Sequence, residues 1–138
     1  MSDKQLNKNT SHLINISPQT LMDWIQNGSV ILADVRETGE FETERIKSVH
    51  SYPLSTFSPE SLSKSLKTHN KKEKTLVLMC RSGNRSRQAA EMLIASGLSD
   101  IHHLNGGLSN WKVSGFQVWQ ENSLAQSKSQ DPFSFLGE

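Results

Sequence analysis

The sequence has little cysteine, no long apolar run and no excess of either charge. Cys80 is the single cysteine in 138 residues, which excludes an intrachain disulfide framework and any Cys-x-x-Cys redox or zinc motif. The 15 Lys and Arg residues nearly balance the 14 Asp and Glu residues, unlike the strongly basic surface of a nucleic-acid binder. No apolar stretch approaches the length that spans a bilayer. We therefore expect neither nucleic acid nor membrane as a partner.

The length of the chain favours one domain with its own core. We expect a flexible N-terminus over residues 1–11, a folded domain over 12–119 and a polar, Ser/Gln-rich tail over 120–138. The opening stretch MSDKQLNKNTSHLI contains no apolar segment of the kind found in signal peptides, which favours a cytoplasmic protein. The apolar stretch PFSFL at 132–136 is expected to pack back on the domain, with a partner or dimer contact as the alternative.

Short apolar runs alternate with amphipathic segments along the chain. The runs at 13–16, 30–35, 75–79 and 101–104 predict strands, and a short edge strand is expected within 46–54. Helices are expected over 18–27, from 59 onward, over 86–96 and around 108–113, with a turn and helical bend at 38–42. This alternation predicts an α/β fold with a parallel sheet covered on both faces.

Cys80 follows the most apolar predicted strand and begins the loop CRSGNRS. Sites in parallel sheets lie beyond the carboxyl ends of the strands, and Asp34 ends another predicted strand. A helix that begins near Arg85 or Ser86 would direct its free N–H groups and its positive dipole end at this loop. Gly83 permits the positive φ that lets such groups converge. This setting lowers the pKa of a thiol, so Cys80 is expected to be a reactive thiolate rather than an inert buried cysteine.

The loop CRSGNRS after an apolar strand resembles the active-site loop of the rhodanese family of sulfurtransferases. DVRE at 34–37 with EF at 40–41, and LNGGLSNW at 104–111, resemble two further segments of that family, in register from about residue 13 to 118. Two stretches depart from the family pattern: ERI at 44–46 stands where Gly-His-Ile is usual, and SV at 48–49 replaces Gly-Ala. The resemblance implies a rhodanese-like three-layer α/β/α fold around a central, mostly parallel five-stranded sheet.

The resemblance also implies a reaction at Cys80. The thiolate would take a sulfane sulfur from an anionic donor such as thiosulfate and pass it, as a persulfide, to cyanide or a cellular thiol. No metal and no organic cofactor is implied. Arg81 and Arg85 would bind the donor by charge-assisted hydrogen bonds, and the loop N–H groups would cradle the outer sulfur. The implied substrate-binding residues are Arg81, Ser82, Gly83, Asn84, Arg85 and Ser86.

Two other functions remain open. The first is a phosphatase or arsenate reductase, since related folds carry a Cys-x5-Arg loop whose wider ring holds a tetrahedral oxyanion. Cys80 and Arg85 form the shorter Cys-x4-Arg spacing, which favours a ring sized for one sulfur atom. The second is a sulfur-relay module that delivers its persulfide sulfur to a protein partner.

Several other polar residues are interpreted as structural. Asp34 and Arg36 are expected to form an ion pair that supports the fold or the active loop. His50, His102 and His103 show no metal-ligand spacing with other candidate ligands. His102 and His103 alternate in a short predicted strand, so only one of them can face the core.

Overall fold

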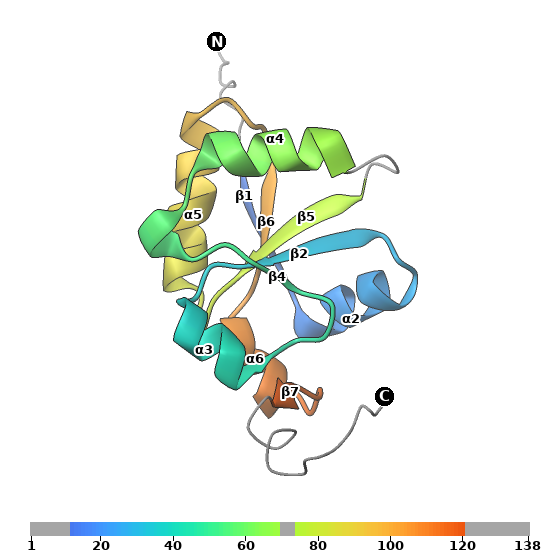
Figure 1. Ribbon diagram of the computed structural model, residues 1–138. Coiled ribbons are helices and arrows are strands. Elements are labelled where there is room, and N and C mark those ends of the chain that lie inside the picture. Colours follow the sequence, from blue (N-terminus) through green and yellow to red (C-terminus); the bar gives the residue numbers. More distant parts are fainter. Residues whose placement is uncertain (1–11, 70–73, 121–138) are drawn as a thin grey trace.

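Five strands form one parallel sheet at the centre of the protein (Figure 1). The structure is a computed structural model that describes residues 12–69 and 74–120. The strands are β1 (Leu13–Ile16), β2 (Val30–Asp34), β4 (His50–Ser51), β5 (Thr75–Met79) and β6 (Ile101–Leu104), in the order β1-β6-β5-β2-β4. All neighbouring strands run parallel, which confirms the predicted sheet. The expected edge strand within 46–54 shortens to the two residues of β4.

Helices cover both faces of this sheet. Leu21 of α2 (Pro18–Gln26) and Trp111 of α6 (Gly107–Val113) belong to one buried cluster. Leu62 of α4 (Pro59–His69) and Leu93 of α5 (Asn84–Ala95) belong to the cluster on the opposite face. The short helix α3 (Thr38–Thr43) and the 3-10 turn η1 (Leu54–Thr56) lie in the connections after β2 and β4. The arrangement is the expected three-layer α/β/α fold, and none of its described helices is long and apolar enough to cross a membrane.

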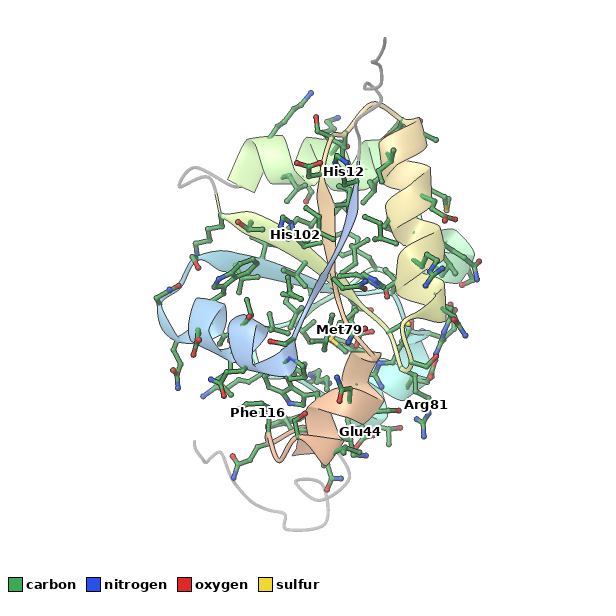
Figure 2. The ribbon with its side chains drawn as sticks, turned by 180° about the vertical axis from the view of Figure 1, so that it is seen from behind. His12, Glu44, Met79, Arg81, His102 and Phe116 are labelled. Atoms are coloured by element: carbon green, nitrogen blue, oxygen red, sulfur yellow. The ribbon has the colours of Figure 1, made fainter. Side chains whose placement is uncertain are left out.

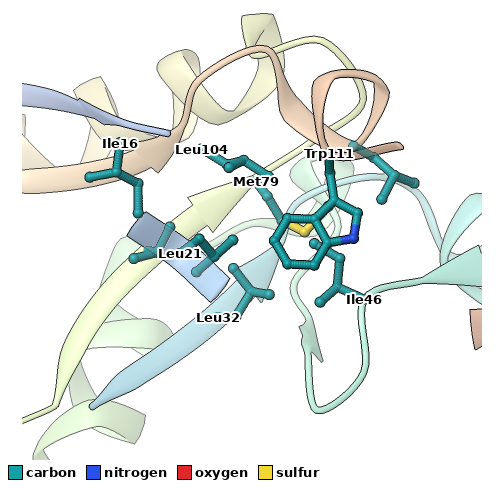
Figure 3. Packing of buried hydrophobic residues seen from close by; sticks show 9 residues of the cluster. Ile16, Leu21, Leu32, Ile46, Met79, Leu104 and Trp111 are labelled. Carbon is teal, nitrogen blue, oxygen red and sulfur yellow. The ribbon is translucent and has the colours of Figure 1, made fainter. Parts of the chain in front are cut away.

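The central strand β5 is buried on both faces, as its continuous apolar run predicts. Val77 and Met79 belong to the cluster shared with α2 and α6, and Figure 3 shows Met79 beside Trp111 of this cluster. Leu78 and Cys80 point into the cluster shared with α4 and α5. Because side chains alternate along an extended chain, the end of β5 directs the thiol toward the start of α5.

A second, two-stranded antiparallel ribbon was not predicted from the sequence. It pairs β3 (Glu44–Arg45) with β7 (Trp119–Gln120), so regular structure extends one residue beyond the expected domain end at 119. The guanidinium of Arg45 lies 4.6 Å from the ring centroid of Phe41 and 4.2 Å from that of Trp119. This cation–π sandwich gives the first departure from the family pattern a structural role, because Arg45 joins β7 to α3. The apolar stretch at 132–136 lies outside the described residues.

The second departure, at 48–49, coincides with an unusual backbone conformation. Ser48 stands where the family pattern has glycine, and its φ is +69°. That left-handed conformation costs a non-glycine residue roughly 1–2 kcal/mol. Two residues earlier, Ile46 is buried in the core cluster of α2 and α6, so the loop before β4 stays anchored.

Candidate active site

The sulfur of Cys80 lies at the carboxyl end of β5, directly before α5. The backbone N–H of Gly83 donates to Sγ over 3.0 Å, and Ser86 Oγ lies 3.6 Å from Sγ. Gly83 precedes the first residue of α5 with a φ of +107°, which is the left-handed turn that glycine adopts without strain. The helix begins at Asn84, two residues before the expected Ser86. The loop therefore folds around the sulfur and presents backbone donors to it.

Opposing effects act on the pKa of the Cys80 thiol. Burial raises it, since the charged form loses water. Hydrogen bonds from the backbone N–H and the hydroxyl of Ser86, and from the N–H groups of Gly83 and Ser82, lower it. The net result is a lowered pKa. The lowered pKa expected from the sequence thus has a structural cause, in which hydrogen bonds from the loop count for more than arginine side chains.

Arg81 and Arg85 occupy different environments. The guanidinium of Arg85 is bound by the carboxylate of Glu40 through two hydrogen bonds, of 2.7 and 3.0 Å. Arg81 is exposed, and its side chain has no hydrogen bond or ion pair within residues 12–69 and 74–120. Of the two arginines proposed for the donor, Arg81 is free to bind an anion, whereas Arg85 fastens α5 to α3.

A surface pocket of about 220 Å3 lies beside Arg81. Figure 2 shows Arg81 and Glu44 at the same end of the molecule, near α6. The pocket is lined by Glu44, Arg81, Leu108, Ser109, Lys112 and Val113. An ion pair of 3.0 Å between Lys112 and Glu44 leaves Arg81 as the unpaired charge of this lining.

Asp34 and Arg36 form the structural ion pair that the sequence predicts. The two side chains are 0% and 1% exposed, and their shortest contact is 2.7 Å. Arg36 also donates to the backbone carbonyls of Glu40 over 3.4 Å and Glu44 over 2.6 Å. The pair therefore holds both ends of the segment that carries Glu40 against the end of β2.

The helix α6 docks its first turn on the backbone of the active loop. Leu108 N–H donates to the carbonyl of Cys80 over 2.8 Å, and Ser109 N–H donates to that of Arg81 over 3.0 Å. A Cβ on Gly107 would lie 2.5 Å from the Cys80 carbonyl oxygen. The backbone of the Gly-Gly segment at 106–107 is thus packed directly against the backbone of the active loop. A side chain at Gly107 would not fit between them.

His103 belongs to the site, although its sequence context did not indicate this. It is buried on β6, and its Nδ1 lies 2.8 Å from Ser86 Oγ. His102 points to the other face of the sheet, where its ring meets Trp24 edge-on. Only the strand order could have indicated His103: β6 lies next to β5, and His103 pairs with Leu78, close to Cys80. Elsewhere, among the described residues, no three His, Cys, Asp or Glu side chains gather to hold a metal ion.

Replacement of Glu40 by Gln is expected to lower the free energy of unfolding by about 1 kcal/mol near neutral pH. The hydrogen bonds from Arg85 hold the pKa of Glu40 at about 2, below its ordinary 4.5. A lowered folded-state pKa stabilises the fold above the unfolded pKa, and this stabilisation is lost as the pH falls through the folded pKa. The wild type and Glu40→Gln should therefore converge between pH 4.5 and about 2.

Urea denaturation across this pH range measures the effect. Glu42 lies exposed on the same helix, and Glu42→Gln is the matched control, with an expected change within about 0.5 kcal/mol. A gap between Glu40→Gln and wild type that stays constant down to the lowest pH would contradict the assignment of the pKa to this pair.

A buried cysteine with a lowered pKa, held by backbone donors between a parallel strand and a helix, is the central feature of this α/β protein. The chain belongs to the rhodanese-like domain family, whose model matches residues 17–114. A solved structure, a rhodanese-related protein from Thermoplasma volcanium, is 28% identical with a TM-score of 0.60 and covers 77% of this chain and 97% of its own.

Named relatives include both short and long proteins. Protein slr1261 of Synechocystis is 42% identical over 102 residues, or 74% of this chain and 54% of that protein. The probable adenylyltransferase/sulfurtransferase MoeZ of Mycobacterium tuberculosis is 35% identical over 70% of this chain and 24% of its own length. Thiosulfate sulfurtransferase GlpE of Pseudomonas syringae is 32% identical over 71% of this chain and 86% of its own. The chain thus spans about half or less of the first two relatives and most of the third.

Proposed function

We propose that the protein is a sulfurtransferase that moves a sulfane sulfur from an anionic donor such as thiosulfate to cyanide or a cellular thiol. The observation that carries the proposal is the Cys80 sulfur, which has a lowered pKa and receives the Gly83 N–H over 3.0 Å. Family membership and the similarity to GlpE support it. A reduced cysteine is required for this activity, which fits the cytoplasmic location expected from the sequence.

The reaction has two steps that share one covalent intermediate. In the first, the Cys80 thiolate attacks the outer sulfur of thiosulfate; an S–S bond forms, the bond to the sulfonate sulfur breaks, and sulfite leaves with the electron pair. In the second, cyanide or a thiolate attacks the outer sulfur of the Cys80 persulfide. Thiocyanate or a new persulfide leaves, and the Cys80 thiolate is restored. The two steps need neither a metal nor an organic cofactor.

The site residues take separate tasks in this scheme. Arg81 is exposed beside the loop and would attract the dianionic donor and the leaving sulfite. The N–H groups of Ser82, Gly83 and Ser86 would stabilise charge on sulfur, as they do for the thiolate. Arg85 is bound to Glu40 and would act by holding the start of α5 in place. Asn84 is exposed at the first turn of α5, at the mouth of the loop.

Incubation with thiosulfate, followed by intact mass measurement, tests the proposal. The wild type should gain the mass of one sulfur atom, and cyanide should remove it with formation of thiocyanate. The Cys80→Ser variant should gain nothing, because a hydroxyl at this place is not ionised and cannot attack sulfur. If the wild type also gains no sulfur from thiosulfate or polysulfide, the proposal fails. Hydrolysis of an aryl phosphate that depends on Cys80 would favour the phosphatase alternative.

A second candidate is sulfur relay to a protein acceptor. It is favoured by the similarity to MoeZ, a longer protein of which this chain spans about a quarter. The chemistry at Cys80 would be unchanged, and only the acceptor would differ. A persulfide that resists cyanide and small thiols, yet leaves Cys80 when a cell extract is added, would identify this role.

A further inference from the structure

The two ring nitrogens of His103 have unlike surroundings. Nδ1 lies 2.8 Å from Ser86 Oγ, whereas Nε2 is buried and has no hydrogen-bond partner in the described part of the chain. The residue is 3% exposed. Buried polar atoms are nearly always paired, so a purely structural histidine would be expected to use both nitrogens. The reaction proposed above gives His103 no task.

The hydrogen-bond network assigns the proton of this ring to Nδ1. Burial, followed by the positive charge of Arg87, lowers the pKa of His103, so the ring is neutral and carries one proton. A proton on Nε2 would be a buried N–H without an acceptor, which is the rarest kind of unsatisfied group. A proton on Nδ1 instead joins the bond to Ser86. In this tautomer His103 is a donor to the serine hydroxyl.

The tautomer decides where the proton of Ser86 can point. The hydroxyl has one proton, and its neighbours are His103 Nδ1 at 2.8 Å, the Gly83 carbonyl at 3.2 Å and Cys80 Sγ at 3.6 Å. If Nδ1 were an acceptor, it would compete for that proton. Because Nδ1 donates, the proton is left for the carbonyl or the sulfur, and a negative sulfur is the stronger attraction.

We propose that His103 is a positioning residue for Cys80, which donates from Nδ1 to Ser86 and so leaves the Ser86 hydroxyl proton to the thiolate. The catalytic relevance of this hydrogen bond rests on the proposed function, in which the Cys80 thiolate is the nucleophile. It involves no contact between His103 and the donor.

Within the described part of the chain, these hydrogen bonds have few charged neighbours. Arg87 of α5 acts on His103, and Arg85 of the same helix interacts with Cys80 and with Asp34 of β2. On the flanking strands, His103 pairs with Leu78 of β5 and Asn15 of β1, neither of which titrates. The arginines stay charged over the pH range of the experiment. A change in the titration of the Cys80 thiol on substitution of Ser86 or His103 therefore reports on those two residues.

The ultraviolet absorbance of the thiolate, followed against pH, tests the inference. Cys80 is the only cysteine, so a Cys80→Ser blank isolates its signal. Ser86→Ala and His103→Leu should each reduce the thiolate fraction near neutral pH by about tenfold, as expected for one lost hydrogen bond to a charged group. His103→Asn should keep most of the thiolate, because its amide N–H can reach the position of Nδ1. The matched control is His102→Leu on the opposite face of β6, which should titrate like the wild type.

The double variant tests whether His103 acts on Cys80 through Ser86. Ser86→Ala with His103→Leu should titrate like Ser86→Ala alone, because His103 acts only through the serine. A wild-type titration in His103→Leu, or equal losses in His103→Leu and His103→Asn, would overturn the inference. If His103→Leu does not fold, loss of thiolate in His103→Asn or its retention in Ser86→Ala would still overturn it. The measurement uses no sulfur donor, so a missing thiosulfate adduct would count against the proposed function alone.

Discussion

The Asp34→Ala variant is expected to lose about 3–5 kcal/mol of its free energy of unfolding. Asp34 and Arg36 are both inaccessible to solvent, and Asp34 accepts from Nε and Nη2 of Arg36 and from the Arg36 backbone N–H. Removal of the carboxylate leaves the guanidinium in the interior with only carbonyl hydrogen-bond partners, and its desolvation is then no longer offset by a directly paired carboxylate. For a domain with a stability of about 5–15 kcal/mol, this loss is a large part of the total.

Two further variants separate the cost of the buried charge from other effects. Asp34→Leu combined with Arg36→Met removes both charges and should recover part of the loss, though not all, because the carbonyls of Glu40 and Glu44 lose their donor. Lys112→Met breaks the partly exposed Lys112–Glu44 pair and should cost no more than about 1 kcal/mol. Guanidinium denaturation measures all three. An Asp34→Ala cost no larger than that of Lys112→Met would refute the assignment.

The parts of the fold that the sequence predicts are those where local patterns and burial agree. The run at 75–79 is apolar on both faces because β5 is buried on both. The Ser17-Pro18 pair predicts the start of α2, and the Ser17 hydroxyl does accept the N–H of Thr20 there. The β3–β7 ribbon could not be predicted in this way, since each strand has two residues. It is held by contacts of Arg45 with the ring of Phe41, in the preceding helix, and with the ring of Trp119, which is distant in the sequence.

In the candidate site, too, local features could be predicted from the sequence and long-range pairings could not. The place of Cys80, the turn at Gly83 and the helix start follow from a strand, a glycine and a helix that are contiguous in the sequence. The pairing of Arg85 with Glu40 joins residues 45 positions apart, and that of Ser86 with His103 joins residues 17 apart. Both pairings depend on tertiary packing that no local pattern encodes. The sequence therefore predicts the loop that carries the sulfur, whereas the partners of Arg85 and Ser86 are known only from the structure.

The tightest packing at the site is between Gly107 and the active loop. A Cβ on Gly107 would lie 2.5 Å from the carbonyl oxygen of Cys80 and 2.6 Å from the carbonyl carbon and oxygen of Arg81. These are backbone atoms, so no side chain can rotate away. The φ of Gly107 is also +61°, which any other residue adopts only with strain.

The Gly107→Ala variant is accordingly expected to lose roughly 3–4 kcal/mol of its free energy of unfolding, from backbone strain and two lost hydrogen bonds. Those bonds run from Leu108 and Ser109 to the carbonyls of Cys80 and Arg81, so the loop should shift and persulfide formation should fall with them. Gly28→Ala is the matched control, because Gly28 has a φ of +73° and nothing within 4 Å of its Cβ position. It should show the cost of strain alone, about 1–2 kcal/mol, with persulfide formation unchanged. Equal losses in the two variants would mean that α6 can move away from the loop without cost.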